Sequence, residues 1–155
     1  MGGVDLSVKK LIAYMVTWTT YGSWLQGEKK GYVKKGVILP GNEKLKTINQ
    51  EQQKFQTVKF DMKQRQIVQN AILEGAKKLK DDILEITVCS NHVHIVFKSS
   101  AESIQNIVRR YKYASTVALR KYGLQGKIWS KGFDKRYCYT DEEVENKIRY
   151  VQSHN

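Results

Sequence analysis

Two histidines stand two residues apart in a short apolar segment, where His92 and His94 alternate with Val93, Ile95 and Phe97. Because successive side chains of a strand project to opposite faces, both imidazoles would lie on one face, about 7 Å apart along the strand. Neutral imidazole nitrogens bind divalent ions when their directions are fixed. A metal site is one interpretation of this pair. The alternative is two ordinary polar residues on a half-exposed strand face.

A tyrosine and a third histidine lie close to the end of the sequence. Tyr150 and His154 are separated by four positions, and side chains at i and i+4 share one face of a helix. The apolar stripe of this segment consists of Val144, Ile148 and Val151 and occupies a different side, so the core does not obviously require Tyr150. A tyrosine at the edge of the core is the alternative interpretation.

The hydrophobic pattern predicts the elements that would position these side chains. Alternation and β-branched residues predict strands over residues 11–20, 83–89, 92–97 and 128–139, and three-to-four spacing predicts helices over 62–79, 103–122 and from 141 onward. This order predicts an α+β protein with the ferredoxin-like or RRM-like βαββαβ arrangement. We expect an antiparallel sheet with helices on one face, an insertion after the first strand and an added C-terminal helix.

Local signals place the ends of the helices. Asp61 is a plausible N-cap for the first helix, whose buried stripe we expect to run from Met62 to Leu79. Thr140 and Glu143 have the spacing of a capping box, with acidic residues where the helix dipole is positive, so the last helix should begin at residue 141.

The length of 155 residues predicts one domain, covering residues 1–155. Residues 21–56 contain five of the eleven glycines and the only proline, without sustained periodicity, and are predicted to form an insertion or a flap over the site.

Composition restricts the partners and the compartment. The net charge of +12 indicates a polyanionic partner, either nucleic acid or an anionic membrane surface. The longest apolar run, Leu11 to Val16, is far shorter than the roughly 20 residues that cross a bilayer, so no membrane span is expected. Two cysteines without CxxC spacing favour the reducing cytoplasm.

Three ordered blocks carry a resemblance to a known family. The block Ser90-Asn-His-Val-His-Ile-Val-Phe97 resembles the histidine–hydrophobic–histidine motif of single-tyrosine HUH transposases. The block Thr17-Trp-Thr-Thr-Tyr-Gly-Ser-Trp-Leu-Gln-Gly27 resembles the first-strand signature of the REP-associated tyrosine transposase branch. Trp129-Ser-Lys-Gly-Phe133 and Tyr150-Val-Gln-Ser-His-Asn155 are similar to its closing block.

The resemblance implies a site and a reaction. It implies His92 and His94 as metal ligands, Tyr150 as the nucleophile, and His154 at the place where relatives carry a Gln or Asn that can complete the metal shell. The implied cofactor is a divalent metal, Mg²⁺ or Mn²⁺. The implied activity is cleavage and rejoining of single-stranded or hairpin DNA through a covalent 5′-phosphotyrosine. It also allows a homodimer in which one protomer supplies Tyr150 to the histidines of the other.

Basic residues between 98 and 139 are interleaved with aromatic ones, which is typical of a nucleic-acid surface. The candidates for phosphate contact are Arg109, Arg110, Lys112, Lys131, Lys135 and Arg136. A solvated basic helix face is the alternative. Two other functions remain open at this stage: a non-catalytic RRM-like nucleic-acid-binding module with structural histidines, and a small metal enzyme acting on another substrate, which the net charge disfavours.

Overall fold

The computed structural model describes residues 10–23 and 57–154. The elements follow the chain in this order: β1 (Ala13–Thr19), α3 (Met62–Leu79), β2 (Ile83–Val88), β3 (His92–Lys98), α4 (Ile104–Tyr122), β4 (Asp134–Cys138) and α5 (Asp141–Gln152). The predicted insertion lies almost entirely in residues 24–56, outside the described residues.

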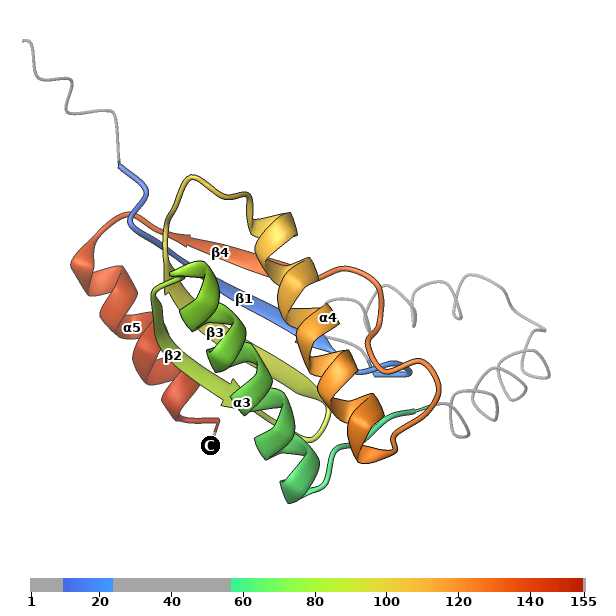
Figure 1. The fold of residues 1–155 in the computed structure, drawn as a ribbon. Coiled ribbons are helices and arrows are strands. Elements are labelled where there is room, and N and C mark those ends of the chain that lie inside the picture. The colour runs from blue at the N-terminus through green and yellow to red at the C-terminus, as the bar shows by residue number, and fades with distance from the viewer. Residues whose placement is uncertain (1–9, 24–56, 155) are drawn as a thin grey trace, which may run out of the picture.

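The four strands form one antiparallel sheet in the order β2-β3-β1-β4. Helices α3 and α4 pack side by side over one face of it (Figure 1). Helix α5 contacts the sheet from the other face. This is the predicted α+β, ferredoxin-like βαββαβ arrangement with an added C-terminal helix, and the fold prediction is confirmed.

Alternation along the two central strands divides the core between the faces. Val16 and Trp18 of β1 and Val93 and Ile95 of β3 belong to the larger apolar cluster, which also includes residues of α3 and α4. On the other face a smaller cluster joins Met15 and Val96 to Val151 of α5. His92 and His94 lie four and two positions before Val96 on the same strand, so their side chains point to the same face, the one that α5 covers.

The local predictions for the helix starts and the hairpin are confirmed. The Asp61 side chain caps α3 by accepting from the Gln64 backbone nitrogen, and the Thr140 side chain caps α5 by accepting from that of Glu143. Ser90 and Asn91 form the turn between β2 and β3, closed by a hydrogen bond from Cys89 nitrogen to His92 oxygen.

Two details of the sequence-based prediction are wrong. The strand expected over residues 128–139 begins only at Asp134, because the chain turns at Gly132, whose φ is +86°, and Trp129 makes only an isolated bridge to Thr20. Met62 and Leu79 were assigned to the buried stripe of α3, but they are 73% and 46% exposed. Both lie in the terminal turns of the helix, beyond the layer that packs on the sheet.

Over residues 10–23 and 57–154, none of the helices has the length and hydropathy needed to span a bilayer.

Candidate active site

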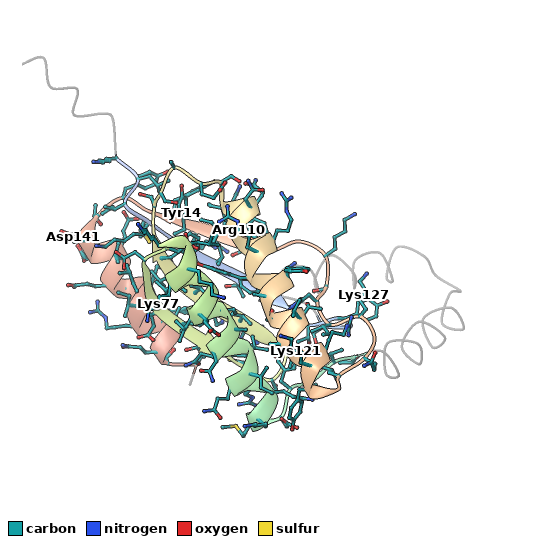
Figure 2. The ribbon with its side chains drawn as sticks, viewed as in Figure 1. Tyr14, Lys77, Arg110, Lys121, Lys127 and Asp141 are labelled. Atoms are coloured by element: carbon teal, nitrogen blue, oxygen red, sulfur yellow. The ribbon has the colours of Figure 1, made fainter. Side chains whose placement is uncertain are left out.

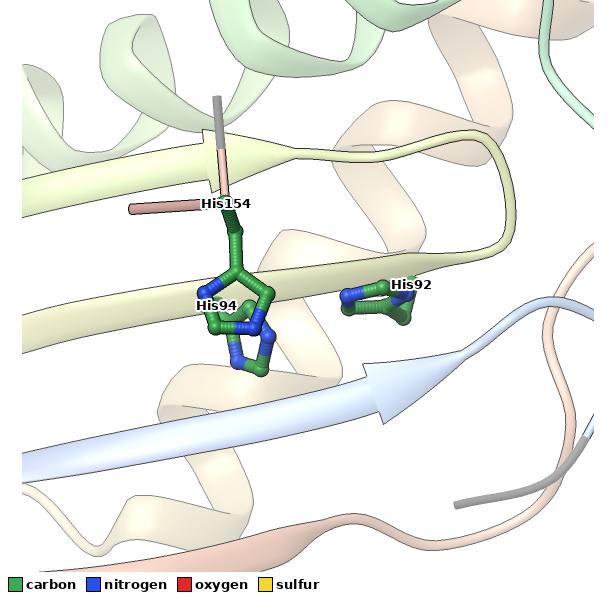
Figure 3. Close-up of side chains that lie close together, drawn as sticks. All are labelled: His92, His94 and His154. Atoms are coloured by element: carbon green, nitrogen blue, oxygen red, sulfur yellow. The ribbon is translucent and has the colours of Figure 1, made fainter. Parts of the chain in front are cut away.

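Three histidines meet on the α5 face of the sheet. His92 and His94 project from β3, and His154 follows the end of α5 (Figure 3). One potential ligand atom from each ring lies within 4.8 Å of the others. The ring centroids of His94 and His154 are 4.5 Å apart, and those of His92 and His94 are 4.7 Å apart. The structure therefore brings together all three predicted ligands.

Hydrogen bonds at Nδ1 determine which ring nitrogen is available in each histidine. Nδ1 of His92 donates to Asn91 Oδ1 at 2.8 Å, and Nδ1 of His154 donates to the carbonyl oxygen of Tyr150 at 2.7 Å. Nδ1 of His94 is hydrogen-bonded to Thr17 Oγ1 at 2.8 Å. An Nδ1–H donor leaves Nε2 with its lone pair, which is the form that binds a metal.

The Nε2 atom of His94 is buried and has no hydrogen-bond partner within the part of the chain that the structure describes. A buried polar atom without a partner is costly unless another group satisfies it. Because Nδ1 of His94 is already hydrogen-bonded to Thr17, Nε2 is the nitrogen that His94 has available for the three-histidine cluster. This orphaned nitrogen and the three-nitrogen donor set fit a divalent metal ion.

Burial keeps two of the imidazoles neutral. Desolvation, followed by the neighbouring imidazoles His92 and His154, lowers the pKa of His94 to about 3. Desolvation and the proximity of His154 also lower the pKa of His92 below its usual value. Near neutral pH these rings therefore do not compete with a metal by binding protons.

Helix α5 carries His154 to this position through contacts with the β2 edge of the sheet. Thr87 Oγ1 donates to the carbonyl oxygen of Val151 at 2.9 Å, and the Gln152 side chain donates to Glu85 Oε2 at 2.9 Å. The Cys89 thiol donates to the His154 carbonyl at 3.5 Å. These contacts, together with the buried Val151, fix the last turn of α5 beside β3.

Tyr150 lies one helical turn before His154 and beside the histidines. Its ring centroid is 4.5 Å from that of His154 and 5.5 Å from that of His94. The side chain is 41% exposed, so the phenol stays accessible instead of packing into the interior. An accessible phenol next to a candidate metal site has the placement of a nucleophile.

The basic residues proposed for DNA contact are divided between the two faces. Arg136 pairs with Met15 in the β4–β1 register and therefore lies on the histidine face, whereas Lys135 pairs with Val16 and lies on the other. Lys131 is exposed in the segment before β4. The remaining candidates, Arg109, Arg110 and Lys112, belong to α4, on the helical layer where Lys77, Arg110 and Lys121 are labelled in Figure 2.

The α4 candidates already have protein partners. The Lys112 ammonium donates to the carbonyl oxygens of Ser130 and Gly132 at 3.0 and 2.8 Å. Arg110 pairs with Glu102, and Arg109 donates to the side chain of Asn106. Their contact with DNA stays a prediction, and the structure adds that Lys112 holds the segment leading into β4.

The sequence analysis missed two residues that orient the histidines, Thr17 and Asn91. Both lie inside the sequence blocks that resemble the family, Thr17 to Gly27 and Ser90 to Phe97. A threonine or an asparagine does not by itself indicate that it orients a histidine. Thr17 becomes recognisable only when the register is known, because it stands directly opposite His94 in the β1–β3 pair. Asn91 adjoins His92 in sequence, and its role depends on the turn geometry.

A ferredoxin-like sheet bearing a His-x-His pair beside a tyrosine-bearing C-terminal helix defines the class of single-tyrosine HUH transposases. The family model described as "Transposase IS200 like" matches residues 44–154 of this chain. The chain therefore belongs to the IS200-like transposase family.

Two solved structures that are similar to this chain are distant from it in sequence. A REP-associated tyrosine transposase, solved bound to a REP hairpin, is 12% identical, with 96% of this chain and 70% of that chain covered and a TM-score of 0.53. A protein of Deinococcus radiodurans R1, described as a transposase, is 10% identical, with coverages of 98% and 97% and a TM-score of 0.49. No curated protein sequence matches the chain.

Proposed function

We propose that residues 1–155 act as one catalytic domain that cleaves and rejoins single-stranded or hairpin DNA through a covalent 5′-phosphotyrosine at Tyr150. The observation that supports this proposal most directly is the arrangement of one accessible phenol beside three convergent imidazoles on the same face of the sheet. Membership of the IS200-like transposase family supports this proposal.

His92, His94 and His154 would hold a divalent metal, Mg²⁺ or Mn²⁺. When bound, such an ion neutralises phosphate oxygens and orients the phosphodiester for attack. A set of three imidazoles favours a transition metal over Mg²⁺, so Mn²⁺ is the better match to these ligands. Thr17 and Asn91 hold two of the rings with Nε2 available.

The proposed reaction exchanges one phosphodiester for another. The Tyr150 oxygen attacks phosphorus and loses its proton, the bond to the 3′ oxygen of the preceding nucleotide breaks, and that oxygen leaves as a 3′-hydroxyl. The 5′ phosphate remains bonded to Tyr150. Because the new ester keeps the energy of the old one, a 3′-hydroxyl can later attack the adduct and restore the strand without a nucleotide cofactor.

The proposed substrate follows from charge and from the solved relative. A protein with net charge +12 is attracted to polyanions, and the REP-associated relative was solved with a REP hairpin. We propose that hairpin or single-stranded DNA binds here, with phosphate contacts drawn from Arg109, Arg110, Lys112, Lys131, Lys135 and Arg136. DNA as substrate and two free cysteines favour the cytoplasm. A homodimer exchanging Tyr150 is compatible with the proposal.

The test is adduct formation on DNA. The protein is incubated with labelled single-stranded and hairpin oligonucleotides and Mn²⁺, and a denaturation-resistant protein–DNA species is measured on a gel. We expect the adduct in the wild type and its loss in Tyr150→Phe. Tyr113→Phe, which alters a tyrosine that is 72% exposed on α4, is the matched control and should retain it.

The same experiment separates catalysis from binding alone. Salt-sensitive DNA binding without an adduct, on hairpins and single strands that include the DNA flanking the gene, would favour the RRM-like binding module. An adduct that persists in Tyr150→Phe and disappears in another tyrosine variant would reassign the nucleophile.

A further inference from the structure

A groove adjoins the histidine cluster at the end of β2. Its cavity volume is about 630 Å³, and it is lined by Met62, Lys63, Arg65, Gln66, Gln69 and Val88. His154 also forms part of its wall. The groove therefore shares one side chain with the candidate active site, although most of its lining comes from α3, on the other side of the sheet.

The α3 residues that line the groove form one stripe along the helix. Met62, Arg65, Gln66 and Gln69 follow the spacing i, i+3, i+4 and i+7, which places them on a common face. The buried residues Val68, Ile72 and Ala76 form the separate face that packs on the core. Met62 is 73% exposed, so the groove combines basic, amide and apolar groups at the surface.

Arg65 is the strongest indication that this groove binds a ligand. Its Nε atom is buried and, among the residues that the structure describes, has no hydrogen-bond partner. The lining contains a second cation, Lys63, and no acidic residue. A guanidinium whose donor is unsatisfied, beside a second positive charge, is suited to a phosphate.

We infer that this groove binds one nucleotide of the single-stranded DNA next to the scissile phosphate. Arg65 and Lys63 contact its phosphate, the Gln66 and Gln69 amides hydrogen-bond its base edge, and Met62 and Val88 contact the base face. The cavity is within the size range of small-molecule sites. This inference rests on the proposed function, since His154, which lines the groove, is also one of the three clustered histidines of the proposed active site.

The mixed lining distinguishes a nucleotide from a free phosphate. A bare phosphate would use only Arg65 and Lys63 and would leave both amides and the apolar surface of Met62 without a partner. Base edges present donors and acceptors that carboxamides match, and polarizable Met side chains adapt to flat apolar surfaces.

The experiment is a titration of the full chain followed by ¹H–¹⁵N NMR, in the Tyr150→Phe variant and without metal. The probes are the four deoxynucleoside 5′-monophosphates, with inorganic phosphate as the comparison. We expect saturable shifts of the Arg65 Nε–H and of the Gln66 and Gln69 side-chain amides with at least one nucleotide. Phosphate should shift the Arg65 signal alone and more weakly.

Variants test the assignment. Arg65→Gln should weaken nucleotide binding about tenfold, the value of one charge-assisted hydrogen bond. The double variant Gln66→Ala, Gln69→Ala should reduce the difference in affinity between nucleotides with different bases, while binding of inorganic phosphate is retained. Lys78→Ala removes a positive charge about 22 Å away from Lys63 along the same helix and should bind like the parent. The dispersion of the NMR spectrum confirms that each variant is folded.

Equal effects of phosphate and nucleotides, or shifts that avoid these three side chains, would overturn the nucleotide site. Because the titration uses neither metal nor Tyr150, its failure would leave adduct formation intact as a separate result. Conversely, nucleotide binding without an adduct on any DNA would retain the groove as a nucleotide site but remove its connection to cleavage.

Discussion

Thr17 shows how a residue outside the proposed ligand set can control the site. Thr17 is buried, and its hydroxyl is hydrogen-bonded to Nδ1 of His94 at 2.8 Å, which fixes the ring and leaves Nε2 available. Partners of this kind determine the tautomer and direction of a metal-binding histidine. The proposed metal site therefore depends on a residue of β1 as well as on β3 and α5.

Replacing Thr17 by valine should weaken metal binding without removing a ligand. Loss of such a partner typically lowers metal affinity by about 10–100-fold. Calorimetric titration of Thr17→Val with Mn²⁺ measures this change. Thr116→Val, the same substitution on α4 and therefore on the other side of the sheet, should bind Mn²⁺ like the wild type. Unchanged affinity in Thr17→Val would remove the positioning role.

The depressed pKa of His94 predicts acid sensitivity of the metal-free protein. In the unfolded state the His94 imidazole binds a proton below about pH 6.5. In the native state it stays neutral until the pH approaches its pKa of about 3. The stabilising contribution is therefore complete above about pH 6.5 and is lost as the pH falls toward 3. Between about pH 7.5 and about pH 5, the protonation of His94 alone lowers the free energy of unfolding by about 2 kcal/mol.

Urea denaturation at the two pH values tests this dependence. The free energy of unfolding of the wild type should fall more steeply than that of His94→Gln, whose side chain does not titrate. Other ionisable groups contribute similarly to both proteins and cancel in the comparison. Parallel loss of stability in the two proteins would show that His94 does not titrate as the buried position requires.

At the scale of elements, α5 carries the proposed nucleophile Tyr150, and the proposed ligand His154 follows directly after its end. Only Val151 of this helix is fully buried, so few apolar contacts hold its position. Its start is fixed by the Thr140 cap and its end by hydrogen bonds to β2 and the β2–β3 turn. A helix with so little buried surface is sensitive to the loss of a single cap.

Removing the cap of α5 should therefore affect the site more than removing the cap of α4. Thr140→Ala and Ser103→Ala each delete a side chain that accepts from a backbone nitrogen, and each should cost about 1 kcal/mol. Hydrogen exchange should show faster opening of α5 in Thr140→Ala, with weaker Mn²⁺ binding. Ser103→Ala should retain Mn²⁺ affinity, because α4 carries no ligand. Equal effects on metal binding would show that α5 is not a separately opening element.

The sequence was sufficient for features encoded locally. Alternation placed His92 and His94 on one face, and the spacing of Thr140 and Glu143 placed the start of α5. It was insufficient for features that depend on strand register or on the path of a turn. The role of Thr17 requires the β1–β3 pairing. The division of the basic residues between two faces requires the β4–β1 register.

At the scale of the whole molecule, the sheet separates basic residues into two regions, one on each side. The histidine face carries Arg136, which also pairs with Asp134 at 3.1 Å. The opposite, helical layer carries Arg109, Arg110 and Lys121. The first region shares its face with the proposed nucleophile Tyr150, because Arg136 and the histidines lie on the same side of the sheet. Contact with the second region would require the DNA to extend around the edge of the sheet, as a folded hairpin could.

This arrangement predicts different effects for two single-charge deletions. Arg136→Ala should weaken binding of a short single strand and reduce the slope of log affinity against log salt by about 0.7, the value for one phosphate contact on single-stranded DNA. Lys121→Ala removes an equal charge from the helical layer and should leave both quantities nearly unchanged. Fluorescence anisotropy over a range of salt concentrations measures both. If the two variants lose affinity equally, binding responds only to the net charge of +12. If Lys121→Ala loses more affinity than Arg136→Ala, the strand lies over α4 and not on the face that carries Tyr150.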